Sequence, residues 1–162
     1  MSELLTLLQE FHREKLAALL RHQAGARLVG QYDLNNTYQY IVNREETQLS
    51  WVASAIRELG GLTTDDGAEP DRGSGGTARA SAPRIFEEDA RDAQAFVDRW
   101  RPRIDGMSNA RHARMLRVIL GEVLEQKRFF EQALAGRTDL LGRRGEAVGP
   151  SHGEVLASRW IE

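Results

Sequence analysis

The chain has 162 residues, a formal net charge of −2 and no cysteine. This size predicts a single domain, and the balanced charge gives no reason to expect nucleic-acid binding. Disulfides, thiolate metal sites and cysteine nucleophiles are excluded. No stretch reaches the roughly 20 apolar residues of a membrane span, and the start of the chain lacks the basic region of a signal peptide. We therefore expect a cytoplasmic protein that binds no membrane.

Two long helical patterns occupy the first part of the chain. Ser2 is a suitable N-cap, and apolar residues then recur every three or four positions as far as residues 24–30. Asp33 can cap a second helix, which continues to the Gly60-Gly61 pair. Glycine is the residue most often found just after a helix C-terminus. The pattern predicts two helices joined by a short turn.

Residues 60–84 differ from both helices, because they are rich in Gly, Asp and Thr and carry few apolar side chains. So long a structureless segment is unusual within a compact domain. It is reasonable if the second and third helices are parallel, since the connection must then travel the length of the bundle. That length is about 40 Å at a rise of ~1.5 Å per residue, which a flexible crossover covers easily. A linker between two domains is the alternative, although neither half has an obvious complete core.

The second part of the chain predicts two more helices and a tail. A third helix covers residues 85–101, and a fourth covers residues 108–135 with Ser108 as its N-cap. No segment alternates with the period of a β-strand, so the fold class is all-α. We predict a four-helix bundle over residues 1–136, with one long crossover between helices two and three, and a C-terminal extension over residues 137–162.

Three glutamates interrupt the apolar stripes of these helices near their middle. Glu14, Glu45 and Glu122 lie at comparable depth in the first, second and fourth helices. Residues three or four positions apart face the same way, so Gln48 can join Glu45, and Gln126 can join Glu122. Carboxylate and amide oxygens suit hard or borderline cations. The candidate metal site comprises Glu14, Glu45, Gln48, Glu122, Glu125 and Gln126.

These motifs resemble those of the ferritin-like superfamily. Glu45-x-x-Gln48 followed by Leu59-Gly60-Gly61 looks like its Glu-x-x-His…Leu-Gly-Gly stretch, and Glu122-x-x-Glu125-Gln126 is similar to the Glu-x-x-Glu-His of rubrerythrins. Glu14 falls about where the superfamily has its first-helix glutamate. The resemblance covers residues 3–60 and 85–135. It implies a ferritin-like bundle in which the candidate residues hold two iron or manganese ions for oxygen or peroxide chemistry.

The sequence departs from this family pattern in two ways. Glutamine replaces both expected histidines, and the third helix has no glutamate on its seam, where Asp89 and Asp92 are short and expected near the surface. Imidazole is a preferred ligand of iron, so these changes put two-iron redox chemistry in doubt. His22 shares no spacing with the acids, so no histidine-based zinc site is expected.

Two functional interpretations remain open. In the first, the protein is a divergent metal-binding member of the superfamily, because buried carboxylates without an occupant destabilise a fold. In the second, it is a non-enzymatic scaffold that has lost its di-iron site and acts through association, as a homodimer that pairs its first two helices. The acids would then pair with Lys15, Arg44, Gln48 or Gln126. Tyr38 is expected to be a core tyrosine with a bonded hydroxyl.

Overall fold

The protein is all-α in the computed structural model, which describes residues 2–64, 67–73 and 78–141. The described residues form four helices and no strand, as predicted. The helices are α1 (Glu3–Ala26), α2 (Tyr32–Glu58), α3 (Ala78–Asp105) and α4 (Ala110–Leu134). Most of the predicted extension, residues 142–162, lies outside the described residues.

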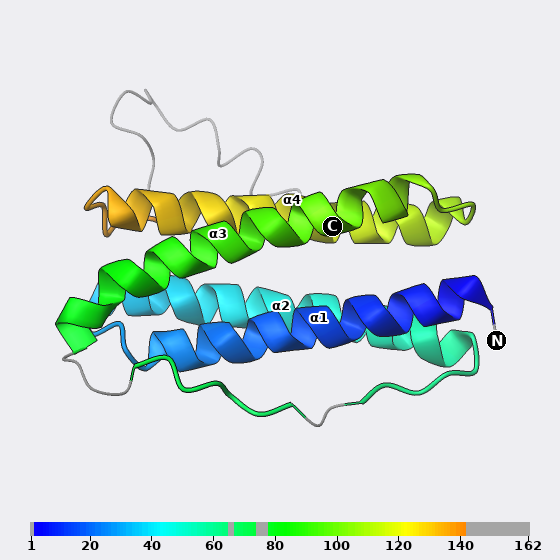
Figure 1. Ribbon diagram of the computed structural model, residues 1–162, viewed down its shortest axis with the longest axis horizontal. Helices are drawn as coiled ribbons and strands as arrows, with labels where there is room; N and C mark the ends of the chain where they lie inside the picture. Colours follow the sequence, from blue (N-terminus) through cyan, green and yellow to red (C-terminus); the bar gives the residue numbers. More distant parts are fainter. Residues whose placement is uncertain (1, 65–66, 74–77, 142–162) are drawn as a thin grey trace, which may run out of the picture.

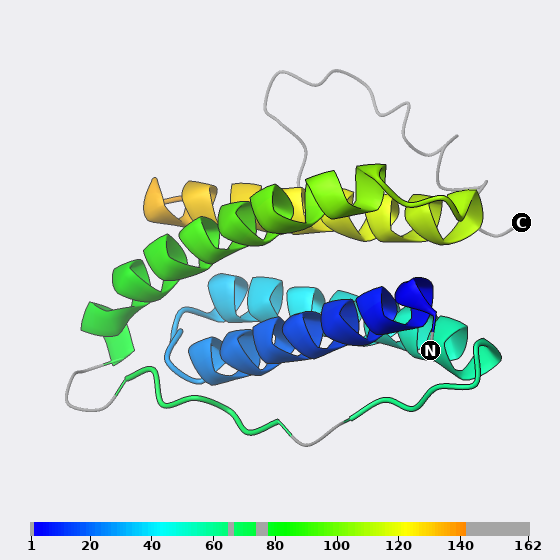
Figure 2. The same ribbon diagram turned by 45° about the vertical axis from the view of Figure 1, so that its right-hand side comes forward.

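Two antiparallel helix pairs are stacked as two layers (Figures 1 and 2). α1 packs against α2, α3 packs against α4, and α2 and α3 run in the same direction. The described residues between α2 and α3, 59–64 and 67–73, run along the outside of α1 (Figure 2). Near the start of this connection, Gln9 Nε2 donates to Leu62 O at 3.1 Å; near its end, Arg27 pairs with Glu69 at 3.0 Å.

None of these helices is both long and apolar enough to cross a lipid bilayer, among the residues that the structure describes. The amphipathic pattern instead divides the buried side chains into two main apolar clusters. One contains Phe11, Trp100 and Ile119, and the other contains Tyr38 and Phe130. Charged and polar side chains are buried along α1 and α2 between the two clusters, and these form the candidate site described below.

Side-chain caps begin three of the helices, although two of these caps differ from the predictions. Ser2 Oγ accepts from the backbone N–H three residues on at 3.1 Å, which confirms the first cap. Gln31 at 2.7 Å and Asn109 at 3.0 Å make the same contact for α2 and α4, so the predicted caps Asp33 and Ser108 are wrong. Asp33 lies instead in the first turn of α2, where its negative charge interacts favourably with the positive end of the helix dipole.

The third helix is longer than predicted at both ends. It begins at Ala78 rather than at residue 85, and it continues through Pro102 to Asp105. The predicted crossover over residues 60–84 therefore includes the first turns of α3. Pro83 lies inside this helix, although a proline lacks the N–H that an interior helical residue donates. Its fixed φ is nevertheless helical, and the Ala- and Arg-rich residues around it favour a helix.

Candidate functional site

A buried group of three ionisable side chains lies on α1 and α2. Glu45 is 0% exposed, Lys15 is 1% exposed and His22 is 5% exposed. Lys15 Nζ donates to Glu45 Oε2 at 2.9 Å, and His22 Nδ1 lies 2.5 Å from Glu45 Oε1. Since a carboxylate can only accept, His22 uses its Nδ1–H as donor. Both oxygens of this carboxylate are therefore held by cationic or N–H groups of α1.

The predicted buried stripe of α1 is correct at Phe11 and Ala18 but wrong at Glu14. The prediction placed Glu14 in the core, whereas its neighbour Lys15 is the fully buried residue. In the structure Lys15 points inward, since the fully buried Glu45 supplies that partner. His22 follows Lys15 after two helical turns on the same face of α1. The pairing of His22 with Glu45 was not predicted, because His22 has no regular sequence spacing to the acids.

The charge of Glu45 is stabilised despite its burial. Burial raises the pKa of this carboxyl, but His22 and Lys15 together outweigh burial and lower the pKa to about 2, from an ordinary value of 4.5. A carboxyl with a lowered folded-state pKa stabilises the fold above its unfolded pKa. This stabilisation is lost as the pH falls from about 4.5 towards 2.

We therefore expect acid to weaken the fold through Glu45. The free energy of unfolding from this group should fall by about 3 kcal/mol between pH 6 and pH 2, at about 1.4 kcal/mol per pKa unit. Urea unfolding at a series of pH values measures the loss. The double variant Lys15→Met/Glu45→Leu is the control, because its stability should fall less over the same pH range. Equal pH profiles for the two proteins would contradict this assignment.

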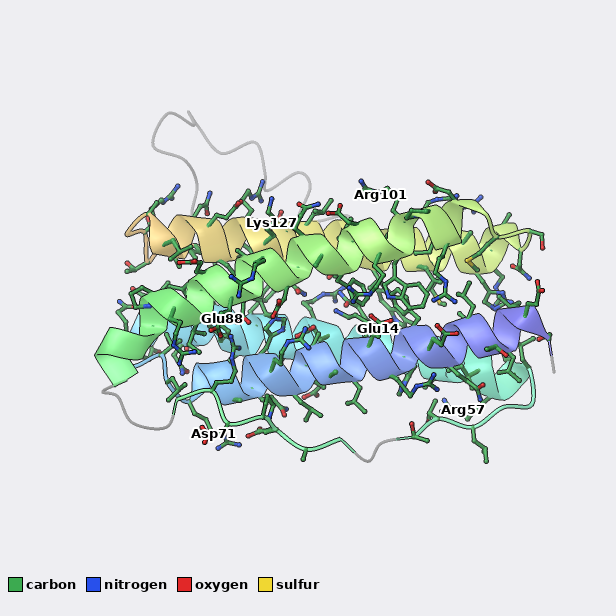
Figure 3. All side chains as sticks on the ribbon, in the orientation of Figure 1. Glu14, Arg57, Asp71, Glu88, Arg101 and Lys127 are labelled. Atoms are coloured by element: carbon green, nitrogen blue, oxygen red, sulfur yellow. The ribbon has the colours of Figure 1, made fainter. Side chains whose placement is uncertain are left out.

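The other three candidate glutamates each form an ion pair with an arginine. Glu14 lies on the side of α1 that faces α3, where Arg99 Nη2 is 2.5 Å from its Oε1 (Figure 3). Glu122 accepts two hydrogen bonds of 2.8 Å from Arg44, and these lower its pKa against the opposing effect of burial. Glu125 pairs with Arg128 on α4 itself. Each of the four candidate glutamates therefore has its own cationic partner, and the described residues contain no group of acidic and histidine side chains that could share one metal ion.

The two glutamines that replace the expected histidines are both buried. Gln48 is 0% exposed and Gln126 is 3% exposed. Gln48 contributes to the lowered pKa of Glu122, yet its amide makes no hydrogen bond of normal geometry within the described part of the chain. Gln126 lines a cavity of about 20 Å³ together with Lys15, His22 and Glu45. This volume is enough for one water molecule.

The residues around Glu45 do not fit a two-metal centre. Lys15 Nζ contacts one carboxylate oxygen and His22 contacts the other, so a metal ion would have to displace both and lie beside a buried ammonium. Like charges at this range repel strongly where water is excluded. Over residues 2–64, 67–73 and 78–141, no group of three or more His, Cys, Asp or Glu side chains could hold a metal ion. Of the expected pairings, Lys15 with Glu45 and Arg44 with Glu122 are present.

A second buried polar group connects α2, α3 and the segment between them. Tyr38 Oη donates to Asp89 Oδ2 at 2.6 Å, and Arg72 Nη2 lies 2.9 Å from Asp89 Oδ1. Burial and the neighbouring Asp89 hold the pKa of Tyr38 well above its ordinary value. The bonded core tyrosine was predicted, but Asp89 is 1% exposed, so its predicted surface position is wrong. Asp92 is half-exposed as expected, and it lies 3.6 Å from Arg21 Nε.

Arg72 fastens the connecting segment to this group. Its Nη1 donates to Arg21 O at 2.9 Å, and its Nη2 lies 3.2 Å from Glu88 Oε1 as well as close to Asp89. Burial lowers the pKa of the Arg72 guanidinium, but the neighbouring Asp89 and Glu88 together outweigh burial and raise it. Neither the spacing nor the composition of the segment predicted this role.

Comparison with protein-family models, with curated proteins and with solved structures finds no match for the chain.

Proposed function

We propose that this protein is a ferritin-like four-helix scaffold that works without a metal. The observation that supports this proposal is the contact between Lys15 Nζ and Glu45 Oε2, which are 2.9 Å apart. Both side chains are buried. Glu45 is the residue whose motif resembles a metal-ligand motif of the superfamily. An internal ammonium beside it supplies the positive charge that a metal would otherwise supply. The burial of this carboxylate then needs no bound ion.

The connectivity of the helices supports the ferritin-like part of the proposal. α2 and α3 are parallel, and a long connection along α1 joins them. A bundle with one long crossover of this kind is the arrangement of ferritin-like folds. With no metal chemistry available at Glu45, we infer that the protein acts through association, including association with a second copy. Light scattering of the purified protein over a range of concentrations measures that self-association.

Metal binding distinguishes this proposal from a working di-metal site. After expression in medium with added iron and manganese and purification without chelator, we expect no bound transition metal and no change of melting temperature on adding Mn²⁺ or Co²⁺. A ligand that binds only the folded state would raise the melting temperature. One or two equivalents of metal that are lost in Glu45→Gln would overturn the proposal.

A gain-of-function variant tests the role of Lys15 directly. Lys15→Glu removes the ammonium and places a second carboxylate opposite Glu45 and next to His22. Because glutamate is shorter than lysine, space for a cation remains between the two carboxylates. We expect this variant to bind Co²⁺ and to melt at a higher temperature in its presence. Lys15→Met is the matched control, because it removes the charge without adding a ligand. If Lys15→Met gained as much metal affinity, the new carboxylate would not be the cause.

A further inference from the structure

A groove between α2 and α4 lies outside the buried charged group. Its volume is about 510 Å³, within the range of pockets that bind small molecules. Three residues predicted for a metal site line it, together with an arginine and two aromatic side chains. The lining residues are Tyr40, Arg44, Glu122, Glu125, Gln126 and Phe129.

Two aromatic rings form one wall of the groove. Tyr40 and Phe129 meet edge to face, with their ring centroids 6.3 Å apart. Tyr40 is 44% exposed, an unusual position for a large ring unless it has a partner. The faces of such rings attract apolar groups and also cations.

The polar wall of the groove carries net negative charge. Arg44 neutralises Glu122 through two hydrogen bonds of 2.8 Å, which leaves Glu125 as the remaining charge on the lining. Glu125 pairs with Arg128, but both side chains of this pair are substantially exposed, at 44% and 60%. Exposed pairs of this kind contribute little, so a ligand cation can compete for the carboxylate.

We propose that this groove binds an organic ammonium ion with a hydrophobic body. The ammonium would lie against Glu125, and the apolar part would pack on Tyr40 and Phe129. Aromatic rings next to a carboxylate favour an ammonium over a carboxylate ligand of the same shape, by charge and by cation–π attraction. Arylalkylamines combine both features.

Titration of the full chain with 2-phenylethylammonium, followed by isothermal calorimetry, tests this site. Phenylacetate, which is similar in size and opposite in charge, is the matched ligand. We expect saturable binding of the amine, roughly tenfold tighter than that of phenylacetate. Equal binding of the two ligands, or no saturable binding of the amine, would overturn the proposal.

Two variants test whether the amine binds in this groove. Glu125→Gln should weaken amine binding severalfold, because it removes the negative charge of the lining that Arg44 does not neutralise. Glu131→Gln should leave binding unchanged, since Glu131 is on the same helix and in an exposed pair with Lys127 but does not line the groove. Equal weakening by both variants would mean non-specific attraction to an acidic helix and would overturn the assignment.

Discussion

Replacement of Glu45 by leucine is expected to lower the free energy of unfolding by about 3–5 kcal/mol. The variant leaves the Lys15 ammonium in the core without a counter-charge, and His22 loses its acceptor. Losing one member of a buried ion pair has this large effect because the remaining charge is neither hydrated nor paired. Urea unfolding at pH 7, followed by circular dichroism, measures the loss.

Two controls separate the unpaired charge from the general effect of a core substitution. The double variant Lys15→Met/Glu45→Leu should recover most of the stability, because an apolar pair of similar volume needs no counter-charge. Glu14→Gln removes a more exposed pair on the same bundle and should cost less than about 1 kcal/mol. If Glu45→Leu is no more harmful than Glu14→Gln, Lys15 is not held by Glu45 as described.

The number and class of the elements could be predicted from periodicity alone. The buried stripe of α2 was predicted correctly through Tyr38, Glu45 and Gln48, because charged and apolar residues there keep a regular spacing. On α1 the same reasoning was correct for Phe11 and Ala18 but chose Glu14 instead of Lys15, two positions about 100° apart around the helix. The error arose because Glu14 and Lys15 are adjacent and either could face inward. Only the position of Glu45 on another helix decides between them.

Contacts between side chains of different helices in the candidate site were also only partly predictable from the sequence. Gln48 and Gln126 were correctly expected in the interior, since both lie on strongly apolar stripes. The expected convergence of Glu122 with Glu45 depended on helix orientation to within a fraction of a turn. Arg44 lies beside the predicted ligand Glu45 in the chain, yet it faces outward and holds Glu122 at the edge of the groove. Pairing of charges across helices is not encoded in local spacing.

Arg72 is expected to be the second residue whose loss strongly destabilises the fold. Among the residues that the structure describes, Arg72→Met leaves the 1%-exposed Asp89 with only the Tyr38 hydroxyl as a close partner. The variant also removes the contacts to Glu88 and Arg21 O. We expect the free energy of unfolding to fall by about 3–5 kcal/mol, as for other broken buried pairs. The connecting segment should also be cut faster by proteinase K, because its main attachment to the core is gone.

A matched pair in the same segment distinguishes this attachment from ordinary surface contact. Arg27 binds Glu69 of the segment through two hydrogen bonds of 3.0 Å, but the arginine side chain is 72% exposed. Arg27→Met should therefore change stability and proteolysis only slightly, since solvent screens this pair. Arg72→Met/Asp89→Asn should regain most of the lost stability, because no buried charge remains. If Arg27→Met and Arg72→Met had equal effects, the segment would be held by its surface contacts and the Asp89 pair would be incidental.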